Sequence, residues 1–466
     1  MQVNTDFQPP PTQQLDDLIQ EYCEHIHDYT KSNKDFTRTR KLPADKLIKT
    51  TLNMQGQSIN AELLKAFPDM TERMSESAFE QAKGKLSPKL YEDLFHSYNQ
   101  TMNKPKTLDL VSSYRVYGID GSDFNPPYQS KSIYAVAYQA GRPRKDGLET
   151  RPFSQIHGNL LYDLLNCTYE DAILQPRSQM DERTAAYTML ERIDNHNPFI
   201  AIMDRGYEGF NFIEHLNRID NCFYIIRAKN GGSAVKEIAN LPDKQCDIDL
   251  EFTITTSGQY YKQNKDKIKN LKHIAVIKTH YKDEIAKTTK DRKWDVGDHC
   301  IVKYRIVKFR INDPETGKEE WETLITNLNR FEFPIDRMKE MYHMRWGIET
   351  SFRNLKYAIG AVNFHSRLDT FVEMELFAHF IMYNAVSRCI NSVSVQQNVK
   401  NKHTYAIDFK MTVMLVQTYY KLYNNIPYQQ LFNEILSYKV AVRPDRKDTR
   451  KAIKPKTAVW FVYRVA

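Results

Sequence analysis

The sequence predicts an α/β fold in which a mixed-sheet core is interrupted by a β-rich insertion and flanked by helical regions at both ends. Residues 106–230 contain apolar, β-branched runs typical of strands, with a helical pattern between the third and fourth runs. Residues 245–328 are β-rich, and most of the remaining chain has helical periodicity. At 466 residues the chain is too long for one hydrophobic core, so we expect several domains.

These patterns divide the chain into segments. We expect a disordered N-terminus at 1–12, a helical domain at 13–105, the first part of the core at 106–230, a β-rich insertion domain at 231–330, the second part of the core at 331–400, and a helical C-terminal region with a basic tail at 401–466. The expected core strands lie at about 114–120, 132–138, 158–163, 199–204 and 222–228. A turn at 312–317 would close a β-hairpin inside the insertion.

The helical domain contains two start signals. Ser87 is expected as an N-cap, with Pro88 at the first helical position. Ser77 and Glu80 have the spacing of a capping box.

Two of the expected core strands lead into aspartates. YRVYGID ends at Asp120 before a Gly-Ser pair, and PFIAIMD ends at Asp204. A carboxylate at the junction of a buried strand and a glycine turn is held rigidly and still reaches solvent, which suits a metal ligand. Asp123 competes with Asp120 for this role, and either junction can equally be a plain turn.

The segment YHMRWGIETSFRNLK places Tyr342, Arg345, Glu349 and Lys356 within roughly 60° of one another if it forms one α-helix. A carboxylate flanked by a guanidinium, an ammonium and a phenol suits a metal-bound phosphodiester backbone, so the expected substrate is DNA or RNA. The alternative is a solvated helix face on which Arg345 and Glu349 form an ordinary ion pair.

In these residue types and spacings the chain resembles the cut-and-paste insertion-sequence transposases of the DDE, ribonuclease H-like superfamily. The resemblance demands two upstream aspartates, and it favours Asp120 over Asp123 because the family places its aspartate before Gly-Ser or Gly-Thr. It implies a ribonuclease H-like core and a catalytic, metal-binding triad of Asp120, Asp204 and Glu349. Two Mg²⁺ ions are expected there, with Mn²⁺ as a substitute.

The same resemblance implies DNA contacts. Tyr342, Arg345 and Lys356 would position DNA, and Trp321 would stack on a base flipped from the DNA end. A Trp packed between strands is the alternative for Trp321. The helical domain at 13–105 would bind terminal repeats, although an oligomerisation module with a basic exterior has the same composition. Its candidate phosphate contacts are Arg38, Arg40, Lys41, Lys83 and Lys85.

Positive charge is concentrated near the C-terminus. The chain has a formal net charge of +8, and residues 439–456 contain eight basic side chains against two acidic ones. Such a stretch suits a phosphate backbone, or it is a solvated tail without a partner. The basic residues expected to contact DNA are Arg446, Lys447, Arg450 and Lys451.

Other classes of function lack support in the sequence. The six cysteines are scattered without a CxxC or Cys/His cluster, which argues against a structural zinc site or a disulfide framework. No phosphate-binding loop, dinucleotide fingerprint or HExxH motif appears, so we expect no nucleotide cofactor. Without a signal-like or membrane-spanning stretch, we expect no membrane partner and a bacterial cytoplasmic, nucleoid-associated location.

The expected function is metal-dependent cut-and-paste DNA transposition. The partners would be the terminal inverted repeats of the element and target DNA, bound by a homodimer in the synaptic complex. Two alternatives remain: a domesticated relative that binds DNA without cutting it, and a ribonuclease H-like nuclease without strand transfer. The helical N-terminal domain and the β-rich insertion favour transposition, since a simple nuclease needs neither.

Overall fold

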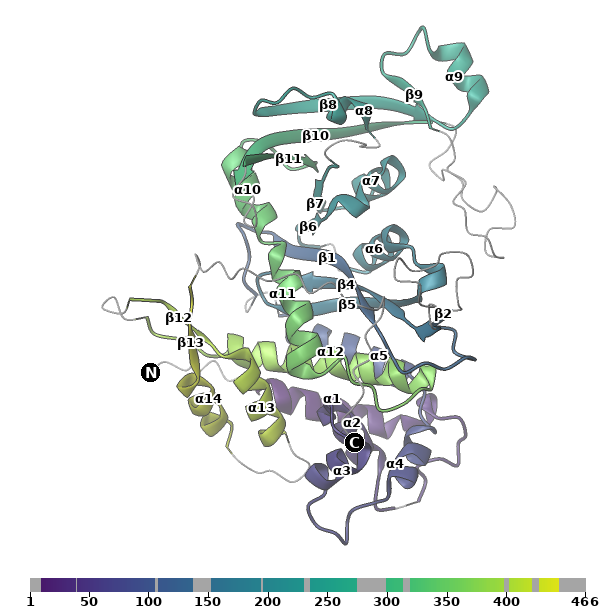
Figure 1. The fold of residues 1–466 in the computed structure, drawn as a ribbon, viewed down its shortest axis with the longest axis vertical. Helices are drawn as coiled ribbons and strands as arrows, with labels where there is room; N and C mark the ends of the chain where they lie inside the picture. The colour runs from purple at the N-terminus through teal and green to yellow at the C-terminus, as the bar shows by residue number, and fades with distance from the viewer. Residues whose placement is uncertain are drawn as a thin grey trace, which may run out of the picture.

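A nine-stranded mixed sheet runs through the computed structural model of the protein (Figure 1). The structure describes residues 10–38, 40–104, 108–136, 152–193, 196–229, 235–274, 299–312, 319–397, 402–420 and 427–443. The strands lie in the order β5 (Thr168–Pro176), β4 (Ile156–Asp163), β1 (Arg115–Phe124), β6 (Phe199–Met203), β7 (Cys222–Arg227), β11 (Glu319–Thr326), β10 (His299–Asn312), β8 (Cys246–Thr255) and β9 (Leu271–His273).

The first five strands of this order form a mixed core. β1 pairs antiparallel with β4, and β4 pairs antiparallel with β5. On its other edge β1 pairs parallel with β6, which pairs parallel with β7. Every residue of β6 is buried, as expected of a parallel strand covered on both faces. The chain therefore has the mixed α/β sheet that its strand pattern predicts.

One core strand differs from the prediction. The run expected at 132–138 contributes only Ala135–Val136 (β2) among the described residues, and this strand pairs with β3 (Phe153–Ser154) outside the large sheet. The third antiparallel core strand is β5 instead. Its sequence, TYEDAILQP, places Glu170 and Asp171 within the apolar run, and these charges conceal the strand pattern.

The β-rich segment extends the core sheet and does not form a separate one. β11 pairs antiparallel with β7, with Leu324 opposite Arg227. β10 then pairs antiparallel with both β11 and β8. The expected turn at 312–317 lies, apart from its first residue, outside the described residues. The described strands of 231–330 are thus joined by continuous pairing to the first five strands of the sheet.

Helices cover both faces of the sheet (Figure 1). On one face lie α6 (Glu182–Glu191) and α7 (Phe210–Asn217), whose apolar residues share a core with Ile119 and Met203. On the other face α10 (Ile335–His343) packs against a core that includes Val116 and Ile202. It is followed by α11 (Trp346–Asn354) and by a π-helical turn, η5 (Leu355–Ile359).

The N-terminal helices share one hydrophobic core with the long helix α12 (Asp369–Asn391). They are α1 (Pro11–Glu24), α2 (Ala44–Asn53), α3 (Ile59–Ala66), α4 (Glu76–Lys83) and α5 (Lys89–Met102). The predicted boundary near residue 105 is therefore not a boundary in packing. Since α1 begins at Pro11, the stretch expected to be disordered overlaps a helix. The N-cap of α4 is Ser75, not the expected Ser77.

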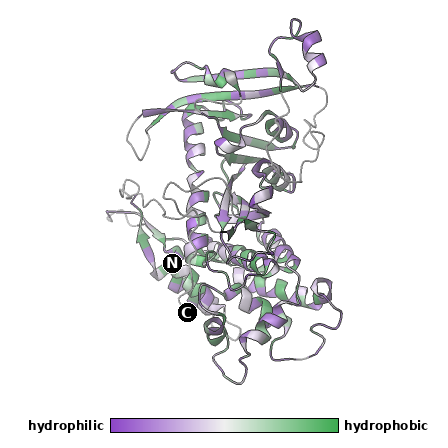
Figure 2. Ribbon diagram, turned by 45° about the vertical axis from the view of Figure 1, so that its right-hand side comes forward, coloured by the Kyte–Doolittle hydropathy of each residue, from purple (hydrophilic) through white to green (hydrophobic). Residues whose placement is uncertain are grey.

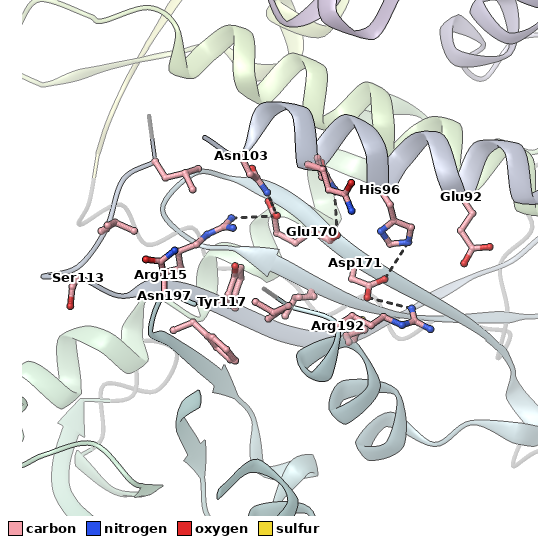
Figure 3. Close-up of a pocket in the computed structure, with 18 residues that line it drawn as sticks. Glu92, His96, Asn103, Ser113, Arg115, Tyr117, Glu170, Asp171, Arg192 and Asn197 are labelled. Carbon is pink, nitrogen blue, oxygen red and sulfur yellow. Dashed lines mark hydrogen bonds and ion pairs between the residues drawn. The ribbon is translucent and has the colours of Figure 1, made fainter. Parts of the chain in front are cut away.

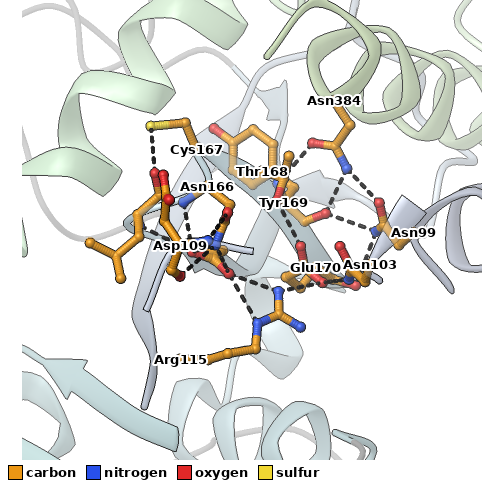
Figure 4. A network of polar contacts seen from close by, with 12 residues as sticks. Asn99, Asn103, Asp109, Arg115, Asn166, Cys167, Thr168, Tyr169, Glu170 and Asn384 are labelled. Carbon is orange, nitrogen blue, oxygen red and sulfur yellow. Dashed lines mark hydrogen bonds and ion pairs between the residues drawn. The ribbon is translucent and has the colours of Figure 1, made fainter. Parts of the chain in front are cut away.

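A polar network joins the edge strand β5 to α5 and α12 (Figure 4). The backbone N–H of Tyr169 donates to Asn384 Oδ1 at 2.8 Å, and its carbonyl accepts from Asn99 Nδ2 at 2.9 Å. The two amides also form a hydrogen bond of 2.8 Å with each other. Side-chain amides thus satisfy the backbone groups that an edge strand leaves unpaired.

The remaining elements are short or lie at the two ends of the molecule. They are η1 (Ile26–Tyr29), η3 (Arg177–Gln179), η4 (Arg205–Tyr207), α8 (Lys236–Ala239), α9 (Gly258–Asn264), β12 (Tyr405–Ile407), α13 (Phe409–Tyr419), α14 (Tyr428–Ser437) and β13 (Lys439–Ala441). Hydrophobic residues are concentrated in the central strands, whereas hydrophobic and hydrophilic residues alternate along many outer helices (Figure 2). None of the described helices has the length and apolar character needed to cross a bilayer.

Candidate active site

Register places Asp120 beside Asp204. The parallel ladder of β1 and β6 ends with Ile119 opposite Met203, and the next residue on each chain segment is the aspartate. Although β1 was expected to end at Asp120, it continues to Phe124 through its pairing with β4. The end of the parallel ladder, not the end of the strand, therefore brings the two carboxylates together.

The glycine turns orient both carboxylates. Asp120 Oδ1 accepts a hydrogen bond from the Gly121 N–H at 2.8 Å. Asp204 caps the short helix η4, and its Oδ1 accepts from the Gly206 N–H at 2.6 Å. One oxygen of each aspartate is thereby fixed by the backbone.

Glu349 reaches this pair through an arginine. On α11, Glu349 Oε1 lies 2.7 Å from Arg345 Nη2, and Arg345 Nη1 lies 3.6 Å from Asp120 Oδ2. Burial, together with the negative charges of Asp204 and Glu349, raises the pKa of Asp120 to about 6 against the opposing effects of the Gly121 N–H and Arg345. Asp204 and Glu349 therefore both act electrostatically on Asp120.

The donor chemistry of these groups fits a hard divalent cation. Asp120, Asp204 and Glu349 offer carboxylate oxygens, the ligands that Mg²⁺ prefers. Among the described residues, no three acidic, histidine or cysteine side chains already enclose a metal position. The guanidinium of Arg345 holds the positive charge between Asp120 and Glu349. Binding of a cation by all three carboxylates therefore requires Arg345 to move.

The helix expected to carry the four signature residues is interrupted at 344–345 and changes to π-helical winding at Leu355. α10 ends at His343, α11 begins at Trp346, and Lys356 lies in the π-helical turn. The prediction of one continuous helical face over 342–356 is therefore wrong.

Near the start of α11 the helix lies close to the turn that follows β4. Gly347 lies so near Leu164 that an added Cβ would be 3.1 Å from Leu164 Cδ2. The π-helical turn ends at Gly360, whose φ of 111° favours glycine.

Tyr342 and Lys356 contact different residues. Tyr342 is buried, its ring lies 5.9 Å from the Arg345 guanidinium, and burial raises its pKa to about 12. Lys356 Nζ lies 5.3 Å from the centre of the Phe124 ring. Burial lowers the pKa of Lys356, while the charge of Asp123 opposes this shift. Tyr342 thus supports Arg345, and Lys356 lies towards the far end of β1.

Asp123, the rival of Asp120, faces a histidine. Its Oδ1 lies 2.8 Å from His157 Nδ1, and this contact is the main cause of its lowered pKa. Asp120, by contrast, has the Arg345 guanidinium at 3.6 Å and a raised pKa. The geometry thus places Asp120, and not Asp123, with Asp204.

Residues 112–385 match the sequence model of a family described as the transposase DDE domain. This match covers more than half of the chain. The chain belongs to the DDE transposase family.

The transposase is also similar to a solved structure, the cryo-EM structure of the piggyBac transposase synaptic complex with hairpin DNA. The TM-score is 0.42 and the sequence identity is 10%, over 91% of this chain and 82% of that chain. The search of curated proteins found no match.

Trp321 of the transposase lies on β11, partly exposed and outside the buried hydrophobic clusters. The Arg310 guanidinium lies 4.9 Å from its ring and Lys308 Nζ lies 5.3 Å from it. By strand alternation Trp321 is on the sheet face opposite Glu322, whose charge acts on Tyr342. The ring therefore lies near two cations of β10, on the face that carries α7.

The predicted phosphate contacts of the N-terminal region differ in accessibility. Arg38 and Arg40 are exposed, and the exposed Lys41 donates to the Thr71 carbonyl at 2.7 Å. Lys85 Nζ lies 3.3 Å from Asp35 Oδ1.

Lys83 is only 2% exposed, and its Nζ lies 2.8 Å from Glu375 Oε1. A buried charge requires a buried partner, and Glu375 is the partner of Lys83. The prediction that Lys83 contacts phosphate is therefore wrong, because its ammonium group is inaccessible and already paired. The basic residues predicted in the tail, Arg446, Lys447, Arg450 and Lys451, lie outside the described residues.

A cavity of about 700 Å³ opens between α5, β5 and α6 (Figure 3). Arg115, the first residue of β1, lines it, about 17 Å along the strand from Asp120. Asp171 in its wall lies 3.7 Å from His96 Nε2 and 3.5 Å from Arg192 Nη1. The cavity is therefore separate from the candidate carboxylates Asp120, Asp204 and Glu349.

Proposed function

We propose that this DDE transposase moves an insertion sequence by a cut-and-paste reaction, with Asp120, Asp204 and Glu349 as its Mg²⁺-binding catalytic triad and Mn²⁺ as a substitute. The observation that carries the proposal is the end of the parallel β1–β6 ladder at Ile119 and Met203, which sets the two aspartates side by side. The strand order of the first five strands is consistent with a ribonuclease H-like core. Strands β8, β10 and β11 correspond to the β-rich insertion in this proposal.

The chain's own residues prepare the site for phosphodiester chemistry. The Gly121 and Gly206 N–H groups hold one oxygen of each aspartate. The second oxygen of Asp120, which lies 3.6 Å from Arg345 Nη1, would become available to a cation when Arg345 moves. Two divalent ions held by Asp120, Asp204 and Glu349 would stabilise the attacking and leaving oxygens of an in-line displacement at phosphorus. Asp120 must be deprotonated to contribute, and its raised pKa makes this step sensitive to pH.

Arg345 has a second role in this proposal. Its guanidinium neutralises Asp120 and Glu349 in the free protein, and in this proposal it exchanges these carboxylates for a phosphate beside the scissile bond. Tyr342 packs beneath Arg345 and orients it. Lys356 contacts a phosphate on the other side of Asp120.

The proposed DNA partners are the terminal inverted repeats and the target DNA, bound by a homodimer in the synaptic complex. Trp321 stacks on a flipped base during hairpin formation. Its intermediate exposure supports this role, because a ring buried between strands would not be accessible to a base. The N-terminal contacts comprise Arg38, Arg40, Lys41 and Lys85.

The test uses a DNA substrate made from the sequences that flank the reading frame. Asp204→Ala and Glu349→Ala should bind these ends and fail to cleave them, whereas Glu340→Ala, an exposed glutamate on the neighbouring helix, should cleave normally. Cleavage at the wild-type rate by either catalytic variant would remove that residue from the triad. Cleavage without joining to target DNA would indicate a nuclease, and end binding without cleavage by the wild type would indicate a domesticated relative.

A further inference from the structure

A buried histidine next to the catalytic strand has no role in the reaction as proposed. His157 lies on β4 opposite Asp123 of β1 and is 5% exposed. Its Nδ1 lies 2.8 Å from Asp123 Oδ1, and its Nε2 forms an ion pair of 3.2 Å with Glu182 Oε1. Glu182 is the first residue of α6. One imidazole therefore joins β1, β4 and α6.

This imidazole packs on the backbone that orients Asp120. A Cβ added at Gly121 would lie 2.4 Å from His157 Nε2 and 2.9 Å from Glu182 Oε1. Side chains do not tolerate such distances, so only glycine allows this approach. His157 therefore packs against the residue whose N–H holds the Asp120 carboxylate.

Glu182 reaches the second aspartate turn as well. A Cβ added at Gly206 would lie 3.6 Å from Glu182 Oε2, which is ordinary contact distance. The Gly206 N–H donates to Asp204. One carboxylate thus lies against both glycine turns.

A positive charge on His157 suits its position between two carboxylates. Burial lowers its pKa, but the hydrogen bonds and charges of Asp123 and Glu182 outweigh burial and raise the pKa to about 9. The imidazolium can then satisfy both carboxylates at once. Neither carboxylate is left as an unpaired charge beside Asp120.

We propose that His157 is a positioning residue of the transposase active site, which holds Glu182 across the two glycine turns and so fixes the separation of Asp120 and Asp204. The inference rests on the proposed function, because it assumes that these aspartates bind the metal ions. Neither His157 nor Glu182 contacts DNA in this role. The separation is set in the free protein, before substrate arrives.

The test is Mn²⁺ binding by the full-length, DNA-free protein, measured by titration calorimetry beside single-turnover cleavage and a thermal melt. Glutamine at 157 can still donate to one carboxylate but cannot join both. For His157→Gln we expect at least a tenfold weaker Mn²⁺ affinity and at least a tenfold slower cleavage, with end binding unchanged. Glu182→Gln should show the same losses, and the double variant should lose no more than either single variant, because the two residues act as a unit.

His96→Gln is the matched control, since it breaks a histidine–carboxylate pair with Asp171 on the same sheet, remote from Asp120. It should leave Mn²⁺ affinity unchanged. An equal loss of affinity in this control, additive losses in the double variant, or wild-type affinity in His157→Gln would each overturn the positioning role.

The remaining outcomes separate a folding defect, a wrong function and a wrong positioning role. If His157→Gln fails to fold, Glu182→Gln provides the same measurement, because its side chain is 35% exposed on the first turn of a helix. If the wild-type protein neither binds Mn²⁺ nor cleaves DNA, the proposed function is wrong and the positioning role fails with it. If the wild type does both and the variants do too, only the positioning role is wrong.

Discussion

Replacing Asp120 by asparagine should stabilise the metal-free protein while removing its activity. Burial and repulsion from Asp204 and Glu349 raise the pKa of Asp120 from 3.8 to about 6. A rise of about 2 pKa units corresponds to roughly 3 kcal/mol of unfavourable free energy for the ionised carboxylate in the folded protein at neutral pH. Asparagine has nearly the same shape, and its carbonyl oxygen still accepts the Gly121 N–H. The variant should therefore gain up to about 3 kcal/mol in its free energy of unfolding.

The same shift fixes the sign of the pH dependence. Because the folded pKa of Asp120 lies above its unfolded value, protonation favours the native state as the pH falls. The stability from this group is fully present below about pH 3.8 and is lost as the pH rises through about 6. The advantage of Asp120→Asn over the wild type should thus fall, by pH 5, to about half of its value at pH 7.5.

Urea denaturation of both proteins in EDTA at pH 7.5 and pH 5 measures this difference. Asp336→Asn serves as the control, because its side chain is 92% exposed and it should change stability little at either pH. Added Mg²⁺ should stabilise the wild type and not Asp120→Asn. A variant less stable than the wild type at pH 7.5, or an advantage that does not shrink at pH 5, would refute the electrostatic reasoning.

Three other outcomes can be measured directly. Trp321→Ala should let nicked DNA accumulate, because the hairpin step loses about 1–3 kcal/mol of stacking, while Trp321→Phe should retain most of it; gels in which every step slows together, with a lowered melting temperature, would exclude the stacking role. Lys83→Met should lower the free energy of unfolding by about 3 kcal/mol by leaving Glu375 without its lysine, with DNA affinity per folded molecule unchanged; weaker binding at a normal melting temperature would restore Lys83 as a phosphate contact. Neutralising four tail residues should reduce the salt dependence of DNA binding by up to about 0.9 in log–log slope for each phosphate that the tail no longer neutralises, and an unchanged slope would mean a solvated tail; these residues are Arg446, Lys447, Arg450 and Lys451.

The parts of the site that the sequence could predict depend on short-range patterns. The strands before Asp120 and Asp204 are recognisable because their apolar runs end in a glycine-containing turn. The i,i+4 spacing of Arg345 and Glu349 indicated an ordinary ion pair as the alternative to a DNA-binding face, and the structure has this pair at 2.7 Å. Each of these features needs only a few neighbouring residues, which local propensity determines.

The features that the sequence could not predict depend on distant partners. β5 contains Glu170 and Asp171, whose charges are tolerated because Arg115 and His96 lie beside them in space. A lysine is usually exposed, so the sequence around Lys83 does not indicate that it is buried. The carboxylate that neutralises it, Glu375, lies 292 residues away in the chain.

His157 was missed for the same reason. It lies within an apolar strand, and its two carboxylate partners come from different elements. No local signal marks a histidine of this kind.

The continuous sheet also limits how the proposed base-stacking role of Trp321 can work. Between β1, which carries Asp120, and β11, which carries Trp321, lie only β6 and β7, so three hydrogen-bonded steps span about 14 Å between these strands. A ladder of backbone hydrogen bonds resists stretching, so this separation of the strands is constant. Trp321 lies on the sheet face that carries α7, whereas α11, which carries Glu349, follows α10 on the other face. A DNA end that used both residues would therefore have to reach both faces of the sheet, and the nucleic acid, which bends and unstacks at a cost of a few kcal/mol, would supply the deformation.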